Sequence, residues 1–383
     1  MVVVNRIAGF AEEMAGWRRH IHMHPELCLQ CHETAAFVVE RLREFGVDHV
    51  ETGVAESGVV AVIDCGEGPV TGLRADMDAL PMQEKTGAVW ASTVPGRMHA
   101  CGHDGHTAML LGAAKYLCET RGFRGKVVLL FQPAEETIGG GRIMVEQGVF
   151  DRYGVEEVYA LHCDPFGALG EFRTRPGPIM AAADDYSVTV RGVGGHAAYP
   201  QECRDPMPVG FAIGQALQAL PRGCDQLESL VVAVTHIQSG SATNIVPDQL
   251  VLGGTVRSFR ADIRDWAERR MGEIVAGCAM AGGVEAVLDY QRNYPATVNH
   301  EAQTRFAVEV AREVSGRVMD DLPPEMGAED FSYMLEARPG CFLFLGQGLG
   351  PSVHHPAFDF NDEAAVYGAS FFARLIERRH RSG

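Results

Sequence analysis

The 383-residue sequence is short of basic residues and has no long hydrophobic run. It contains 33 Lys and Arg against 50 Asp and Glu, which gives a formal net charge of −17. Such a chain repels phosphate groups and anionic lipid headgroups, so we expect neither nucleic acid nor a membrane as its partner. No stretch reaches the ~18 consecutive apolar residues that a membrane-spanning helix requires.

Other features are missing as well. The N-terminal segment lacks the basic, apolar and small-residue order of a secretory signal, so we expect a cytoplasmic protein. Ten cysteines are too few for a disulfide scaffold of this length, and in a reducing compartment they are expected to be buried thiols or metal ligands. The composition, with 46% hydrophobic and 22% charged residues, is that of a globular protein of two or three domains.

Short apolar runs punctuated by glycine predict strands buried on both faces. They lie at 58–66, 70–80, 125–133 and 156–164. Helical periodicity is found at 34–45 and 107–120, and strand and helix alternate again near the C-terminus at 300–314, 341–346 and 362–380. This alternation predicts an α/β domain with a largely parallel sheet.

Residues 184–293 follow a different pattern. An alternating strand, a helix, two strands, a long helix and a last strand succeed one another, which is the β-α-β-β-α-β order of a ferredoxin-like domain. We therefore predict a discontinuous α/β domain, formed by 1–183 and 294–383, with a compact domain of residues 184–293 inserted into it.

The densest group of chemically active residues lies between Met98 and His106, where three His, one Cys and one Asp occupy the sequence MHACGHDGH. Cys and His together suit zinc or another borderline divalent metal. Glu135 and Glu136 directly follow an apolar strand, and one such carboxylate can bind a metal while the other transfers a proton. A metal-free His-rich loop and an exposed acidic turn are the alternative interpretations of the two segments taken singly.

Further candidates lie at the carboxyl ends of predicted strands or in nearby loops. They are Asp76 with Asp78, His162, and His354 with His355. In open α/β sheets this edge is where ligands bind, so the convergence of the separate signals favours a metal site.

The inserted domain has its own candidates, His196 on a glycine-rich turn, Asn244, and Arg257 at the end of a strand. A histidine, an amide and a guanidinium could together bind a carbonyl oxygen and a carboxylate. Each also has an ordinary interpretation as a turn or surface residue.

Taken together, the ordered motifs resemble the M20 metallopeptidase and amidohydrolase family, in particular its aminoacylase, hippurate hydrolase and auxin-conjugate hydrolase branch. The motifs are RADMDALPMQE, MHACGHDGHTAMLLGAA, LLFQPAEE, ALHCDP, GVGGHAAYP, TNIVPDQLVLGGTVRSF, GAEDFSYML and HHPAFDFND. The resemblance runs from about Trp17 to Asp362. One departure is Gln201, where the branch often has a histidine; it leaves the substrate preference open.

The resemblance implies a catalytic mixed-sheet α/β domain with a ferredoxin-like lid that forms dimers. It implies two divalent metal ions, held by Cys101, His103, Glu136, His162 and His354. Glu135 would be the general base, and Asp76 would orient a ligand. His196, Asn244 and Arg257 would bind the substrate, and His196 could serve the active site of a partner subunit.

The expected reaction is metal-dependent hydrolysis of the amide bond of an N-acyl amino acid, with a homodimer or homotetramer as the assembly. A dipeptidase or carboxypeptidase of the same family is one alternative, and a non-catalytic metal-binding protein is another. Zinc, manganese, cobalt and nickel all remain open, because the S, N and O ligands accept several metals.

Overall fold

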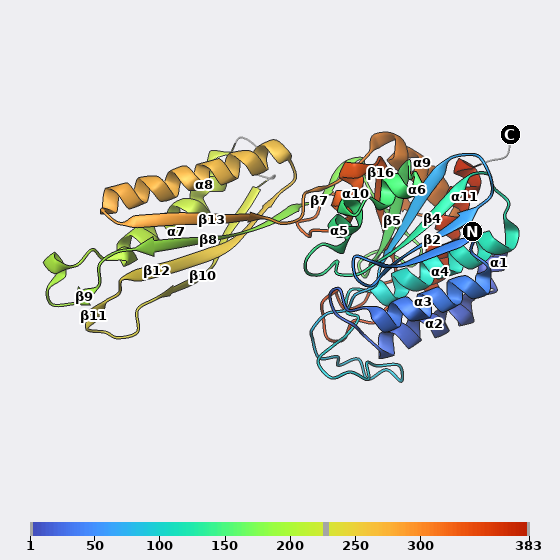
Figure 1. Ribbon diagram of the computed structural model, residues 1–383, viewed down its shortest axis with the longest axis horizontal. Coiled ribbons are helices and arrows are strands. Elements are labelled where there is room, and N and C mark those ends of the chain that lie inside the picture. Colours follow the sequence, from blue (N-terminus) through green and yellow to red (C-terminus); the bar gives the residue numbers. More distant parts are fainter. Residues whose placement is uncertain (1–2, 225–229, 381–383) are drawn as a thin grey trace. The chain divides into compact units, whose positions relative to one another are not determined.

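The computed structural model describes residues 3–224 and 230–380, and it divides the chain into two compact units (Figure 1). Unit 1 comprises residues 1–179, 298–323 and 330–383, and unit 2 comprises residues 180–297 and 324–329. None of the helices in the described ranges combines the length and apolar character that crossing a bilayer needs.

Unit 1 is built on an eight-stranded sheet in the order β1-β2-β4-β3-β5-β16-β6-β15. The strands are β1 His49–Val54, β2 Gly58–Asp64, β3 Val70–Asp76, β4 Lys126–Gln132, β5 Glu157–Asp164, β6 Phe172–Arg173, β15 Val318–Met319 and β16 Gly340–Gly346. The four central strands β4, β3, β5 and β16 are parallel, whereas β2 is antiparallel to β4 and β6 to β16. The sheet is therefore mixed, as predicted.

Helices cover this sheet because its central strands are apolar on both faces. In Figure 1, α2, α3 and α4 lie together on one side, and α4 also packs against α11. The helices of unit 1 are α1 Asn5–Ala8, α2 Ala11–Met23, α3 His32–Phe45, α4 His103–Thr120, α5 Gly140–Glu146, α6 Val149–Tyr153, α9 Glu301–Val314, α10 Phe331–Ala337 and α11 Asp362–Arg379. The short strands β7 Gly177–Met180 and β14 Thr297–Asn299 lie where the chain passes from one unit to the other.

Unit 2 has the predicted β-α-β-β-α-β order, formed by β8 Ala182–Arg191, α7 Pro206–Ala219, β10 Leu230–Ser239, β12 Gln249–Ser258, α8 Ala261–Gly282 and β13 Glu285–Arg292. Its sheet is antiparallel throughout, in the order β10-β12-β8-β13. A separate two-stranded arm pairs β9 Gly195–His196 with β11 Ile245–Val246, and short 3-10 turns lie at Pro200–Glu202 and Leu220–Gly223.

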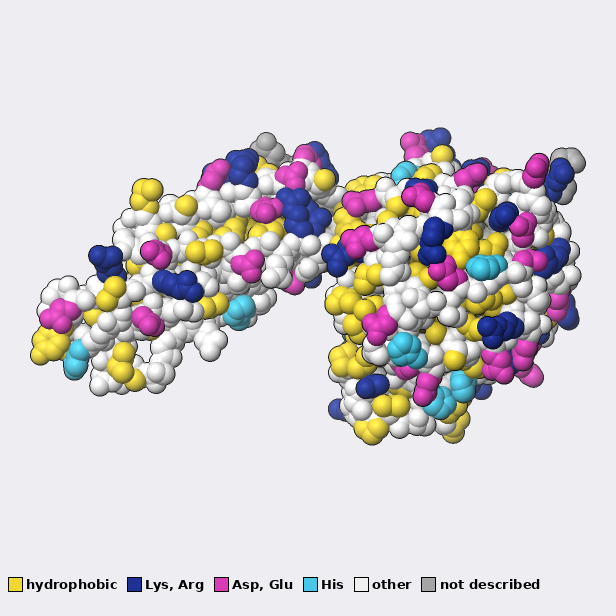
Figure 2. Space-filling model, viewed as in Figure 1, with side chains coloured by type: hydrophobic (Ala, Val, Ile, Leu, Met, Phe, Trp, Pro, Cys, Tyr) yellow, Lys and Arg dark blue, Asp and Glu magenta, His cyan; other side chains and the backbone are white. Residues whose placement is uncertain are grey.

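The acidic side chains are not gathered into one patch on the visible surface (Figure 2). On the visible face in Figure 2, acidic and basic side chains are interspersed among one another and do not form a patch of one sign. The excess of acidic residues is therefore spread over this face.

Candidate metal centre

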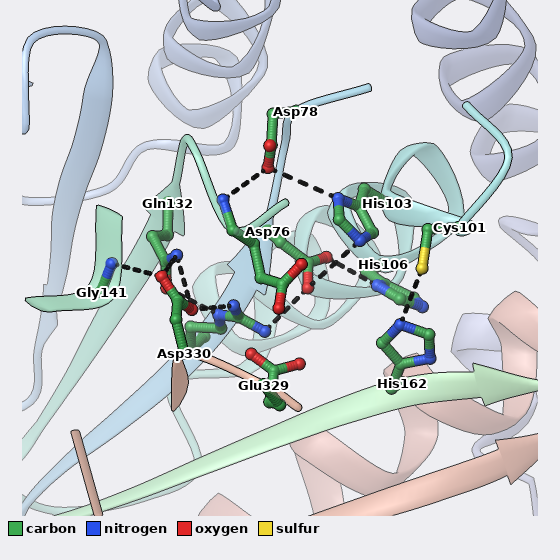
Figure 3. A network of polar contacts seen from close by, with 12 residues as sticks. Asp76, Asp78, Cys101, His103, His106, Gln132, Gly141, His162, Glu329 and Asp330 are labelled. Carbon is green, nitrogen blue, oxygen red and sulfur yellow. Dashed lines mark hydrogen bonds and ion pairs between the residues drawn. The ribbon is translucent and has the colours of Figure 1, made fainter. Parts of the chain in front are cut away.

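Several candidate residues of unit 1 lie at the carboxyl ends of its central parallel strands. Asp76 ends β3 and Asp78 follows it, Glu135 and Glu136 follow β4, and His162 lies near the end of β5. Carboxyl ends of parallel strands meet at one edge of a sheet, and Figure 3 shows Asp76, Asp78 and His162 there, close to Cys101 and His103.

Helix α4 begins at His103, within the CGHDGH segment, four residues before the start of the helix predicted at 107–120. Gly102 is the N-cap of α4 with a φ of +86°, and a Cβ on it would lie 2.5 Å from Cys163 Sγ. A Cβ on Gly105 would lie 2.4 Å from the Phe360 ring. The glycines therefore let the first turn of α4 approach its neighbours closely, which fixes His103 on rigid structure.

The five proposed ligands form two overlapping groups. In each group, one ligand atom per residue can be chosen so that all of them lie within 4.8 Å of one another. The first group is Cys101, His103 and His162, and the second is Cys101, Glu136 and His354. Cys101 Sγ lies 3.3 Å from His162 Nε2, and Glu136 Oε1 lies 3.2 Å from His354 Nε2.

The hydrogen bonds around these groups fit a metal ion. His162 Nδ1–H donates to the Cys163 carbonyl at 2.8 Å, which leaves the Nε2 lone pair facing Cys101. Among the described residues, the ring nitrogens of buried His103 and Glu136 Oε1 lie near groups of opposite charge but make no hydrogen bond of good geometry. Buried polar atoms without partners are rare, and a cation bound between them would satisfy them.

The electrostatics around His103 and Cys101 also favour a cation. Burial opposes protonation of His103, but the carboxylates of Asp76, Asp78 and Glu136 raise its pKa to about 10. Burial, together with Glu136 and Glu135, raises the pKa of the Cys101 thiol well above its usual range. A nearby divalent cation would offset this excess negative charge and favour the thiolate.

Asp78 holds the glutamate pair and His103 from one side. Its Oδ1 accepts the backbone N–H of Glu135 at 2.9 Å, and its Oδ2 accepts that of Glu136 at 3.1 Å. The same Oδ1 lies 3.5 Å from His103 Nδ1. The sequence pairs Asp76 with Asp78, but the family resemblance implies an orienting role for Asp76 alone, so the contribution of Asp78 is seen only in the structure.

Asp76 contacts a different set of residues. Its Oδ1 accepts a 2.6 Å hydrogen bond from His106 Nδ1–H, and its Oδ2 accepts one of 2.7 Å from Arg74 Nη1. Burial disfavours the carboxylate, but His103, Arg74 and His106 hold the pKa of Asp76 well below its usual range. Asp76 therefore lies behind the metal-facing residues as a buried anion.

His106 belongs to the same motif yet has no nitrogen available for a metal. Its Nε2 accepts the backbone N–H of Cys163 at 2.8 Å while Nδ1–H donates to Asp76. Burial lowers its pKa to about 4, which agrees with a neutral ring that donates on one side and accepts on the other. His106 thus connects Asp76 to the backbone beside His162.

His354 differs from the other proposed ligands because its side chain is 51% exposed. It adopts a left-handed φ of +62°, and its backbone N–H donates to the Ala100 carbonyl at 2.7 Å. This bond places His354 beside the Cys101 segment. The neighbouring His355 is exposed, and its Nδ1 accepts the backbone N–H of Ala357 at 3.1 Å.

Within unit 2, the structure brings two of the three expected substrate-binding residues together. His196 pairs with Ile245 across the arm, and Ala197 N–H donates to the Asn244 carbonyl at 3.0 Å. His196 and Asn244 are both exposed, and His196 Nδ1 accepts the backbone N–H of Ala198. In a neutral ring this leaves the proton on Nε2, as a donor for a ligand.

Arg257 lies at the opposite end of the unit 2 sheet. It pairs with Ala183 near the start of β8, whereas the arm follows the other end, where Gln249 pairs with Arg191. The distance along β12 from Gln249 to Arg257 is about 26 Å at the usual rise per residue. Arg257 and His196 of one subunit therefore do not share one small pocket.

Comparison with known proteins places the chain in a family. Residues 72–378 match the model of Peptidase family M20/M25/M40. The chain is 39% identical to the N-acetyl-L-cysteine deacetylase of Bacillus subtilis, covering 97% of this chain and 90% of that protein. It is 36% identical to the hippurate hydrolase of Campylobacter jejuni, covering 98% of each.

A solved structure from Bacillus subtilis, described as a dinuclear metal binding peptidase from the M20 family, superposes with a TM-score of 0.87. It is 32% identical, and the match covers 98% of this chain and all of that one. The chain belongs to peptidase family M20/M25/M40, as its motifs predicted.

Proposed function

We propose that this protein is a metal-dependent amidohydrolase that cleaves N-acyl amino acids into a carboxylic acid and a free amino acid. The observation that carries the proposal is the convergence of Cys101, His103, Glu136, His162 and His354 beside a second glutamate. The similarity to an N-acetylcysteine deacetylase and a hippurate hydrolase, which act on such amides, supports the substrate class.

Cys101, His103 and His162 would hold one divalent ion, and Cys101, Glu136 and His354 would hold the other. Cys101 belongs to both groups, so it would contribute to holding each ion. When bound, the ions would lower the pKa of a water molecule and polarise the amide carbonyl.

Glu135 would act as the general base. It is 7% exposed, and Asp78 fixes its backbone together with that of Glu136. Its carboxylate would take a proton from the attacking water and then deliver a proton to the leaving amine. The Asp78 carboxylate thus fixes the backbone of both glutamates, of which Glu135 would transfer the proton and Glu136 would hold a metal ion.

Arg257 would bind the α-carboxylate of the substrate, since a guanidinium binds a carboxylate with two hydrogen bonds. His196, with its Nε2–H as donor, would stabilise the carbonyl oxygen, and Asn244 would assist it. The distance between Arg257 and the arm supports the view that His196 and Asn244 serve the active site of a partner subunit.

The edges of the unit 2 sheet support a homodimer. Edge strand β13 carries the charged residues Glu285, Asp289 and Arg292, which discourage pairing with another strand. The opposite edge strand β10, with the sequence LVVAVTHIQS, has no Asp, Glu, Lys or Arg, and it exposes Val231 and Ile237. Pairing of β10 with a second copy would cover this edge.

A hydrolysis panel with metal analysis of the same sample tests the proposal. Acetyl, benzoyl and longer acyl derivatives of several amino acids are compared with dipeptides and with the same N-acyl amino acids amidated at the carboxyl group. We expect hydrolysis of the acyl amino acids, two metal ions per chain, and a strong loss on amidation. Preference for dipeptides would assign a dipeptidase, and metal binding without hydrolysis of any substrate would contradict the proposal.

A further inference from the structure

A buried guanidinium links two segments that are far apart in the sequence. Arg18 lies on α2 with 1% of its side chain exposed. Its Nη1 donates to Asp359 at 2.9 Å and lies 3.7 Å from Asp104, and its Nε donates to Asp362 at 2.7 Å. One side chain thus meets three carboxylates.

The carboxylates flank proposed metal ligands. Asp104 directly follows His103 in the first turn of α4, and it is fully buried. Asp359 follows His354 on the segment that leads into α11, and Asp362 is the first residue of that helix. Arg18 therefore ties the segment that carries Cys101 and His103 to the segment that carries His354.

His22, one helical turn beyond Arg18, strengthens this connection. Its Nδ1 lies 2.8 Å from Asp104 Oδ2, and its Nε2 lies 3.4 Å from Glu84 Oε1. The Glu84 carboxylate in turn accepts the backbone N–H of Ser92 at 2.6 Å. Helix α2 is therefore joined to the start of α4 and to the loop before it by buried polar contacts.

We propose that Arg18 and His22 are positioning residues that hold Cys101, His103 and His354 at the spacing needed for metal binding. The proposal rests on the proposed function, because it takes these three residues as ligands. Within the described residues, neither Arg18 nor His22 bonds to a proposed ligand side chain. Arg18 acts through Asp104, Asp359 and Asp362, and His22 acts through Asp104. Partners behind metal ligands commonly contribute ten- to a hundredfold to metal affinity.

Metal affinity, measured by competition with a coloured chelator, tests this inference. Arg18→Met should weaken at least one metal site by about ten- to a hundredfold. Arg264→Met is the matched control, because Arg264 is a largely buried arginine paired with buried Asp184 in unit 2. It should bind metal like the wild type. Equal affinity in Arg18→Met and wild type would overturn the inference.

His22 provides a second test if Arg18→Met does not fold. His22→Asn keeps a donor near the place of Nδ1, so it should retain most of the metal affinity that His22→Leu loses. His380→Leu is the control for loss of a buried histidine, since His380 binds Thr71 and the Arg124 carbonyl. Equal metal affinity in His22→Leu and His380→Leu would overturn the inference, whereas a wild type that binds no metal would instead overturn the proposed function.

Discussion

The proposed functional residues of the two units differ in how their surroundings hold them. In unit 1, His103, His162 and the glutamate pair lie among hydrogen bonds and carboxylates from β3, β4, β5 and α4. In unit 2, His196 and Asn244 are exposed on a two-stranded arm. The proposed metal ligands therefore all come from unit 1 of a single chain, whereas the role proposed for the arm requires the surface of a partner subunit.

The largest effect is expected from a substitution that removes the proposed metal centre of unit 1. Cys101→Ala takes away the residue shared by both proposed metal groups, so both ions should be lost and hydrolysis should fall to background. Cys118→Ala, at a buried thiol farther along α4, should keep both metal content and activity. Full activity in a verified metal-free sample of the wild type would refute the metal dependence.

The next prediction tests whether the arm of one subunit contributes to the active site of its partner. His196→Ala and Glu135→Gln should each be nearly inactive, because each lacks one part of the site. After subunit exchange, a mixed dimer would have one intact site, and equal mixing should restore roughly a quarter of wild-type activity. Exchange that is confirmed by mass but brings no recovery would mean that each subunit is self-sufficient.

A smaller effect is expected from a substitution on edge strand β10, where we propose that two subunits pair. Ile237→Lys places a charge on edge strand β10 and should shift the protein toward monomers in sedimentation. Val287→Lys is the matched control, because Val287 is an exposed apolar residue on the other edge strand, β13. Dissociation by Val287→Lys with an intact Ile237→Lys dimer would place the interface on β13.

The smallest effect is a pH dependence of stability within unit 1. Burial opposes protonation of His22, but Asp104 outweighs it and raises the pKa of His22 to about 9, above the ordinary value of 6.5. The protonated pair therefore stabilises the fold fully below about pH 6.5, and this stabilisation is lost as the pH rises through 9.

Urea unfolding of the metal-free protein checks this effect. The stability advantage of wild type over His22→Asn should shrink by roughly 1 to 3 kcal/mol between pH 6.5 and 9.5. An advantage that grows with pH would show that His22 is neutral in the folded protein.

The sequence predicted the architecture because its signals are local. Apolar runs gave the central strands, and the β-α-β-β-α-β order of unit 2 followed from periodicity alone. The start of α4 was placed four residues too late, because the helical periodicity is clear only from residue 107 and Gly102 and Gly105 interrupt the segment before it. Their close contacts with Cys163 and Phe360 come from other segments and leave no local pattern.

The surroundings of the metal centre were harder to predict for the same reason. The residues of the ligand motifs stand out by type and spacing, but Arg18 meets Asp362 across 344 positions of sequence. Likewise, residue type and spacing alone do not separate His106, whose two nitrogens are both engaged, from His103 three residues earlier; only the resemblance to the family singled out His103. Such distinctions depend on the tertiary contacts of each ring.

The adjacent glutamates test the central claim most directly. Metal content and hydrolysis rate should be measured side by side for Glu135→Gln and Glu136→Ala. Glu135→Gln keeps the shape and removes the base, so it should retain both ions while the rate falls about a hundred- to ten-thousandfold. Glu136→Ala should lose metal first, with activity falling as a consequence. If Glu135→Gln loses its metal while Glu136→Ala keeps both ions, the assignment of the two roles is wrong.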